Sequence, residues 1–122
     1  NAVFLSKESV DIYNPKTIRS TMGSIYRMPI IYVDDLLELM DVFNKKGIKS
    51  YAAHLEGENT YDKEDYYQGT AILIGNEGNG LREEVSNKAD TWVRIPMEGK
   101  GESLNAAIAA SVLMFEVYRQ RR

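Results

Sequence analysis

Two glycine-containing segments in the last third of the chain hold the residues best suited to chemistry. One segment covers positions 74–81 and the other positions 95–107. Their polar residues are Asn76, Glu77, Ser103 and Asn105. Each segment begins as an apolar stretch, breaks into a glycine-rich turn and continues into a predicted helix. Glycine lets the backbone approach a ligand closely, and a fold needs no such pair of turns for stability. The two segments therefore predict a binding site.

The glycines of the first segment could form a phosphate cradle, but neither phosphate-binding pattern is complete. A P-loop needs Gly-Lys-Ser/Thr after its last glycine, whereas Leu81-Arg82 follows Gly80. A dinucleotide fingerprint fails because Glu83 stands where its third glycine should be. The carboxylate of Glu77 would repel a phosphate and suits a cationic ligand or a hydroxyl donor. For the glycines alone, a tight turn between strand and helix stays open as the alternative.

Ser103 and Asn105 also have a structural alternative. Serine is a common helix N-cap. Asparagine within a first helical turn competes with the backbone hydrogen bonds, so a side chain directed into a cleft would explain Asn105. The only histidine is His54, which excludes a Ser-His-Asp triad, and a lone histidine at a strand end is more often packed or at the surface. No residues have metal-ligand spacing, so we expect no metal.

Aromatic and basic residues give two further expectations. A charged stretch contains Tyr61, Tyr66 and Tyr67. These tyrosines could stack on unpaired bases, but in such a loop they more often hold the loop to the protein body. Trp92 is expected in the core or at a subunit contact. Arg119, Arg121 and Arg122 suit the negative end of a helix dipole, where a solvated helix end would suffice.

The elements that position these residues alternate between strands and helices. Strands are predicted at positions 2–5, 30–33, 49–53, 70–74 and 91–95. Helices are predicted from Pro15 to just before Gly23, from a cap at Asp34 or Asp35 to Gly47, and at positions 81–88 and 103–119. The stretch 56–67 is expected to be an exposed loop. This order predicts an α/β fold with a largely parallel sheet flanked by helices. Ligands bind beyond the carboxyl ends of such strands, and both segments begin there.

Length and composition indicate one globular domain over residues 1–122. The hydrophobic share of 43% and charged share of 27% are ordinary for a soluble protein. No apolar run approaches the roughly 20 residues that span a membrane. The lack of cysteine excludes a disulfide framework and fits the cytoplasm. The net charge of −3 argues against a strongly basic nucleic-acid platform but leaves room for a local basic patch. Because Asn1 directly precedes a strand, we expect a truncated N-terminus.

Three stretches of the chain resemble the SpoU (TrmH-like) RNA 2′-O-ribose methyltransferases. Residues 72–81, Ile-Leu-Ile-Gly-Asn-Glu-Gly-Asn-Gly-Leu, resemble the second signature of that family. Residues 95–109, from Ile95-Pro96-Met97 through Ser103-Leu104-Asn105, resemble the third. Residues 14–29 resemble the segment between the first and second signatures. The resemblance covers nearly the whole chain, and the paired signatures at this spacing are specific.

The resemblance implies a SPOUT fold, in which a parallel sheet flanked by helices ends in a C-terminal trefoil knot. Knots are rare, so physics alone would not predict this one. It also implies a homodimer that binds S-adenosylmethionine in the knot. The implied cofactor-binding residues are Gly75, Asn76, Ile95, Met97, Leu104 and Ala53. The implied catalytic residues are Asn105, Ser103 and Glu77.

The implied reaction transfers a methyl group to a ribose 2′-hydroxyl of RNA, with rRNA preferred over tRNA. The family uses an arginine of its first signature to promote this step, and that signature is expected upstream of Asn1. We therefore expect the 122 residues to be inactive alone. Two alternatives stay open: a non-catalytic RNA-binding or scaffold module of the same fold, and a nucleotide-binding regulator of the doubly wound type.

Overall fold

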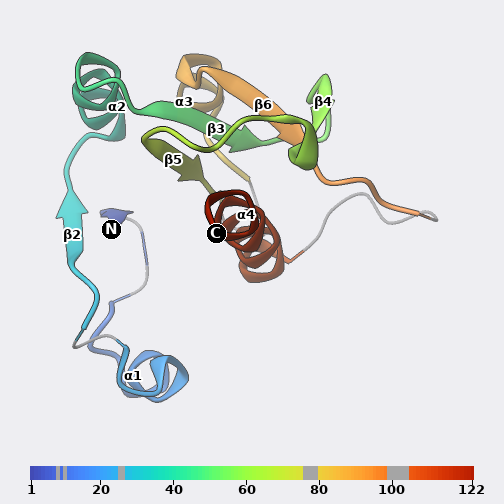
Figure 1. Ribbon diagram of the computed structural model, residues 1–122. Coiled ribbons are helices and arrows are strands. Elements are labelled where there is room, and N and C mark those ends of the chain that lie inside the picture. The colour runs from blue at the N-terminus through green and yellow to red at the C-terminus, as the bar shows by residue number, and fades with distance from the viewer. Residues whose placement is uncertain (8, 10, 25–26, 76–79, 99–104) are drawn as a thin grey trace. The chain divides into compact units, whose positions relative to one another are not determined.

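The computed structural model describes residues 1–7, 9, 11–24, 27–75, 80–98 and 105–122, apart from the side chain of Ile18 (Figure 1). The described chain forms two compact units, Asn1–Leu39 and Met40–Arg122. Among the described residues, no helix has the length and apolar character that a membrane crossing requires.

The first unit is a two-stranded parallel sheet with one short helix. Strand β1 (Val3–Ser6) pairs with β2 (Ile30–Val33), and α1 (Pro15–Thr21) lies between them in the chain. Helix α1 starts as predicted, because the Asn14 side chain accepts a hydrogen bond from the Lys16 amide (2.9 Å) and Pro15 occupies the first turn. The helix ends at Met22, a left-handed cap with φ 51°, just before Gly23 at φ 88°.

Helix α2 (Leu36–Lys45) follows β2 and is capped by one of the two predicted aspartates. The Asp35 carboxylate accepts a hydrogen bond from the Leu37 amide (2.9 Å). Asp34 instead forms an exposed ion pair with Lys7 (3.3 Å). Gly47 follows the helix at φ 75°, as expected for a glycine that closes a helix.

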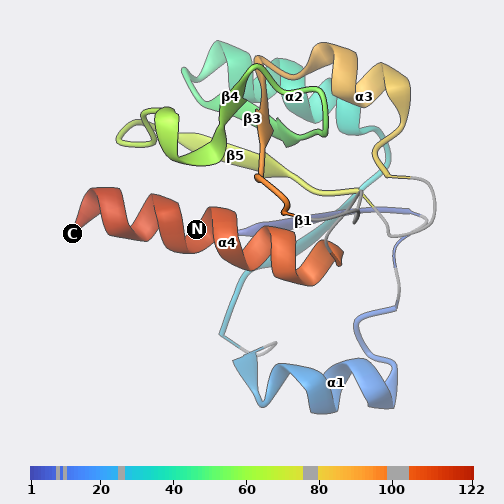
Figure 2. The same ribbon diagram turned by 90° about the vertical axis from the view of Figure 1, so that its right-hand side faces the viewer.

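The second unit contains a four-stranded parallel sheet with the strand order β4-β6-β3-β5. Its strands are β3 (Lys49–Ala53), β4 (Asn59–Thr60), β5 (Thr70–Leu73) and β6 (Thr91–Arg94). Its further helices are η2 (Tyr61–Lys63), α3 (Glu83–Lys88) and α4 (Ala106–Arg121). Figures 1 and 2 show α3 and α4 on opposite faces of the sheet. The predicted α/β class with a parallel, helix-flanked sheet is confirmed.

The core of the second unit lies between the sheet and α4. Its buried members are Tyr51, Tyr66, Val93 and Leu113. The rings of Tyr51 and Tyr66 meet edge to face, with centroids 4.8 Å apart. Since side chains alternate along a strand, the neighbours Ser50, Ala52 and Trp92 point to the other face. There the Trp92 indole donates a hydrogen bond to the Ser86 carbonyl of α3 (2.7 Å).

The stretch 56–67, expected to be an exposed loop, is only partly so. It contains β4 and η2, and Tyr66 is fully buried. The Tyr66 hydroxyl donates to the Tyr61 carbonyl (2.5 Å), and the Tyr51 hydroxyl donates to the Asp65 carbonyl (3.0 Å). Burial raises the pKa of both phenols. Tyr61 and Tyr66 thus hold the loop to the body as expected, while Tyr67 is 65% exposed.

The end of α4 does more than complement the helix dipole. The Arg121 guanidinium donates to the carbonyls of Tyr66 (2.8 Å) and Gln68 (2.6 Å). Arg119 forms a bidentate pair with the buried carboxylate of Glu116 one turn earlier. A merely solvated helix end is therefore the wrong interpretation for these two arginines.

Candidate cofactor site

Three of the predicted cofactor residues lie at the carboxyl ends of neighbouring parallel strands, Ala53 within β3 and the other two just beyond β5 and β6. The register pairs Ala53 with Val93 and Ala52 with Leu73. Ile95 lies two residues beyond Val93, and Gly75 lies two residues beyond Leu73. Ala53, Gly75 and Ile95 therefore share the carboxyl edge, where ligands of such sheets bind.

Gly75 stands where two parts of the chain meet without room for a side chain. A Cβ atom added to Gly75 would lie 2.1 Å from the carbonyl carbon of Gly80 and 2.1 Å from the amide nitrogen of Leu81. Both atoms belong to the backbone and cannot turn away. Gly80 itself adopts φ 67°, with open space around its missing Cβ. The two glycines thus have different roles: close contact at Gly75 and a left-handed turn at Gly80.

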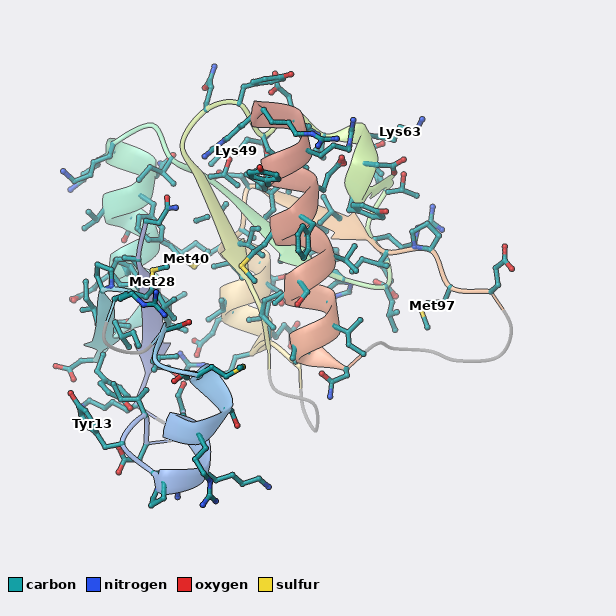
Figure 3. The ribbon with its side chains drawn as sticks, turned by 60° about the horizontal axis from the view of Figure 1, so that its bottom comes forward. Tyr13, Met28, Met40, Lys49, Lys63 and Met97 are labelled. Carbon is teal, nitrogen blue, oxygen red and sulfur yellow. The ribbon has the colours of Figure 1, made fainter. Side chains whose placement is uncertain are left out.

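The side chains at this edge are mainly apolar. Ala53 and Ile95 are half-buried and pack against the core of the second unit. Met97 is 36% exposed, and Figure 3 shows it on the extended segment that leaves β6. This combination of a half-buried apolar floor and backbone at strand ends suits a flat, apolar ring with a polar rim.

Asn105 is the N-cap of α4. Its Oδ1 atom accepts hydrogen bonds from the amides of Ala107 (2.8 Å) and Ile108 (3.4 Å). The helix begins at Ala106, three residues later than predicted, so the cap suggested for Ser103 is wrong. Asn105 therefore precedes the first helical turn. Its side chain supplies an acceptor to free amides at the start of the helix instead of competing with the backbone hydrogen bonds. A role in chemistry is therefore not required to explain this asparagine.

Four predicted site residues lie outside the described part of the chain. They are Asn76, Glu77, Ser103 and Leu104. Their assignments stay predictions. Elsewhere in the described residues, no group of three histidine, cysteine or acidic side chains could hold a metal ion.

His54 is packed at the end of β3, as a lone histidine at that position suggested. Its ring stacks on Trp92, with centroids 3.9 Å apart and planes 9° apart. Its Nδ1 atom accepts a hydrogen bond from the Glu56 amide (3.1 Å). Trp92 is half-buried within the chain.

Sequence reasoning missed Gly57, which shapes the turn beside the carboxyl edge. A Cβ atom at Gly57 would lie 2.8 Å from the carbonyl carbon of Val93 on β6. A glycine in a polar stretch resembles any turn residue, so the sequence carries no signal for this contact.

Comparison with known proteins decides the family. The sequence model of the SpoU rRNA Methylase family matches residues 1–115. The chain belongs to this family. The structure of the SpoU methyltransferase AviRb from Streptomyces viridochromogenes, solved in complex with AdoMet, matches with a TM-score of 0.90 and 34% identity. That match covers 98% of this chain and 47% of AviRb. The fold implied by the resemblance is thus confirmed as that of SpoU methyltransferases, while its knot stays a prediction.

Relatives in the SpoU family modify different RNAs. The 23S rRNA (guanosine(2553)-2′-O)-methyltransferase RlmP of Bacillus subtilis is 32% identical over 117 residues, which are 96% of this chain and 47% of RlmP. The TrmH/SpoU tRNA modifying enzyme of A. aeolicus matches with a TM-score of 0.82 and 28% identity, over 98% of this chain and 61% of that enzyme. The chain spans about half the length of the curated relatives it matches.

Proposed function

We propose that this chain is the cofactor-binding region of an S-adenosylmethionine-dependent RNA 2′-O-ribose methyltransferase that acts in the cytoplasm. The observation that carries the proposal is the meeting of Ala53, Gly75 and Ile95 at one carboxyl edge in a member of the SpoU family. The similarity to RlmP supports rRNA over tRNA as the substrate.

The described residues fit the adenosine part of S-adenosylmethionine. Adenine needs a flat apolar surface and a few hydrogen-bonding groups at its rim. The half-buried Ile95 and Ala53 offer the apolar surface, and the backbone near Gly75 offers amides and carbonyls. We assign Met97, Leu104 and Asn76 to the same pocket.

Methyl transfer to RNA requires an aligned ribose and a route for its proton. The bound cofactor supplies a methyl group activated on a sulfonium. The protein must hold the 2′-hydroxyl in line with that methyl group and accept or share the hydroxyl proton. We assign this work to Asn105, Ser103 and Glu77, together with an arginine from outside these 122 residues.

Isothermal titration calorimetry with S-adenosylmethionine or S-adenosylhomocysteine tests the cofactor assignment. We expect binding between low-micromolar and sub-millimolar dissociation constants, about −5 to −8 kcal/mol. The control is adenosine 5′-triphosphate, whose phosphates the carboxylate of Glu77 is expected to repel. A folded protein that shows no heat with either sulfur ligand, or that binds the triphosphate equally well, would contradict the assignment.

We further propose that the exposed face of α4 pairs with a second copy of the chain. Four large side chains along this face are 53–72% exposed. They are Ile108, Met114, Phe115 and Tyr118. Phe115 lies seven residues after Ile108 and three before Tyr118, and Met114 lies four before Tyr118, so the four side chains share one side of the helix and form a stripe. The opposite face of α4 already packs on the sheet. A second, exposed apolar face on the same helix indicates that another protein surface covers it.

Sedimentation velocity of a Phe115→Glu variant tests this dimer. Placing a charge within an apolar contact is expected to convert the dimer to a monomer at micromolar concentration. Val42→Glu is the matched control, because Val42 is 44% exposed on α2 and outside the stripe. A wild-type monomer, or a Phe115→Glu dimer of unchanged strength, would refute the assignment.

A further inference from the structure

The positive charge of the first unit is concentrated around α1. Residues 12–33 contain Lys16, Arg19 and Arg27 and no acidic residue. The net charge of the whole chain is −3 and that of this stretch is +3. All other residues together therefore carry −6. An RNA-binding protein gains most of its affinity from cations near phosphates. In an acidic chain, this stretch is a local basic patch of the kind that such binding uses.

The three basic side chains lie near one another and point to solvent. Lys16 and Arg19 are exposed and one helical turn apart on α1, so they lie on the same side of the helix. The Nη2 atom of Arg27 lies 3.8 Å from the Cβ position of Gly23, which places its guanidinium at the end of α1. Within the described part of the chain, none of the three forms an ion pair, in contrast to Lys7 with Asp34.

Two unusually exposed apolar side chains lie at the two ends of α1. Tyr13, in the turn that leads into α1, is 68% exposed (Figure 3). Met22, at the C-cap, is 88% exposed and holds a left-handed backbone conformation that is unfavourable for a residue with a side chain. Exposed tyrosine beside cations is the combination that single-stranded RNA sites use, with rings stacking on bases and cations contacting phosphates.

We propose that Tyr13, Lys16, Arg19, Met22 and Arg27 form an α1 surface that binds a single-stranded segment of the RNA substrate. This inference rests on the proposed methyltransferase function and adds the part of the chain that holds the RNA. Tyr13 stacks on an unpaired base, the three cations contact successive phosphates, and Met22 provides apolar contact with a neighbouring base.

The charges are tested with a triple variant, Lys16→Gln, Arg19→Gln and Arg27→Gln, in the intact protein. The probe is a fluorescently labelled single-stranded RNA of mixed sequence, about 20 nucleotides long, which exceeds the site of a single groove. Each lost phosphate contact lowers the slope of log K against log salt by about 0.7, so the slope should fall by roughly 2. The matched control replaces the exposed Lys45, Lys46 and Lys63 by glutamine and should leave the slope nearly unchanged. Equal changes in both triple variants would overturn the α1 surface.

Stacking is tested with Tyr13→Ala. Loss of one stacked base should weaken binding roughly 5- to 150-fold without changing the salt slope. Tyr67→Ala is the control, because Tyr67 is similarly exposed but belongs to the second unit. Unchanged affinity of Tyr13→Ala, or an equal loss with a duplex of the same length, would overturn the stacking contact.

Calorimetry with S-adenosylmethionine on the same variants separates this inference from the proposed function. All variants should keep the cofactor affinity of the wild type, since none lies at the carboxyl edge. If the wild type binds the cofactor while the α1 variants bind RNA normally, only the α1 surface fails. If the wild type binds no cofactor, the proposed function fails instead.

Discussion

Gly75→Ala is expected to abolish S-adenosylmethionine binding and to lower the free energy of unfolding by at least about 3 kcal/mol. The added methyl group would lie 2.1 Å from backbone atoms of Gly80 and Leu81. Relief requires the end of β5 to separate from the chain that follows the loop. The carboxyl edge would then lose the arrangement that brings Gly75 beside Ala53 and Ile95. Chemical denaturation and calorimetry measure the two effects.

Gly80→Ala is the matched control for this prediction. It makes the same chemical change at the other side of the contact, but its methyl group enters open space. Only the left-handed φ of 67° opposes alanine there, at a cost of about 1–2 kcal/mol. Cofactor binding should weaken little. Equal losses for the two variants would show that backbone strain, and not the close contact, makes glycine necessary at Gly75.

Local patterns were sufficient to predict most elements of this fold. Strands β2 and β3 have the predicted bounds because their apolar runs end in clear turn or capping residues. The Asn14-Pro15 start of α1 and the end of α2 before Gly47 follow equally from neighbouring residues. These features depend on contacts within a few positions, which a sequence displays directly.

Features that depend on distant contacts could not be predicted in this way. Strand β4 has only two residues in a polar stretch, and it forms by pairing Asn59 with Val93, 34 positions away. The burial of Tyr66 likewise depends on Gln120, whose side chain accepts a hydrogen bond from the Tyr66 amide (2.9 Å). The glycines of the candidate site predicted a turn near a ligand, but only the structure separates the close contact at Gly75 from the turn at Gly80.

Asn105 is the predicted site residue whose structural and chemical roles now compete most directly. The cap uses Oδ1, because both of its partners are amide donors and the atom that faces them must be oxygen. A contribution to methyl transfer would come from the amide nitrogen of the same side chain. The two roles therefore belong to different atoms and can be separated by substitution.

Three variants separate these roles. Asn105→Asp and Asn105→Ser keep an oxygen that can cap α4, whereas Asn105→Ala removes it and should destabilise the protein by about 1 kcal/mol. If the amide nitrogen assists the reaction, all three variants should lower the rate of methyl transfer roughly 100- to 1000-fold, the usual loss for one donor at a reacting oxygen. Their affinities for S-adenosylmethionine should change much less.

The contrast between stability and rate decides the role of Asn105. If Asn105 only caps the helix, Asn105→Asp and Asn105→Ser should transfer methyl groups at near-normal rates. Only Asn105→Ala should then lose stability or activity. If the amide nitrogen is catalytic, the aspartate and serine variants should be stable and bind the cofactor but transfer methyl groups slowly. Single-turnover methylation at saturating cofactor, measured together with thermal unfolding on variants that also include the arginine from outside these 122 residues, compares the two. Parallel losses of rate and cofactor affinity in all three variants would instead assign Asn105 to the shape of the cofactor pocket.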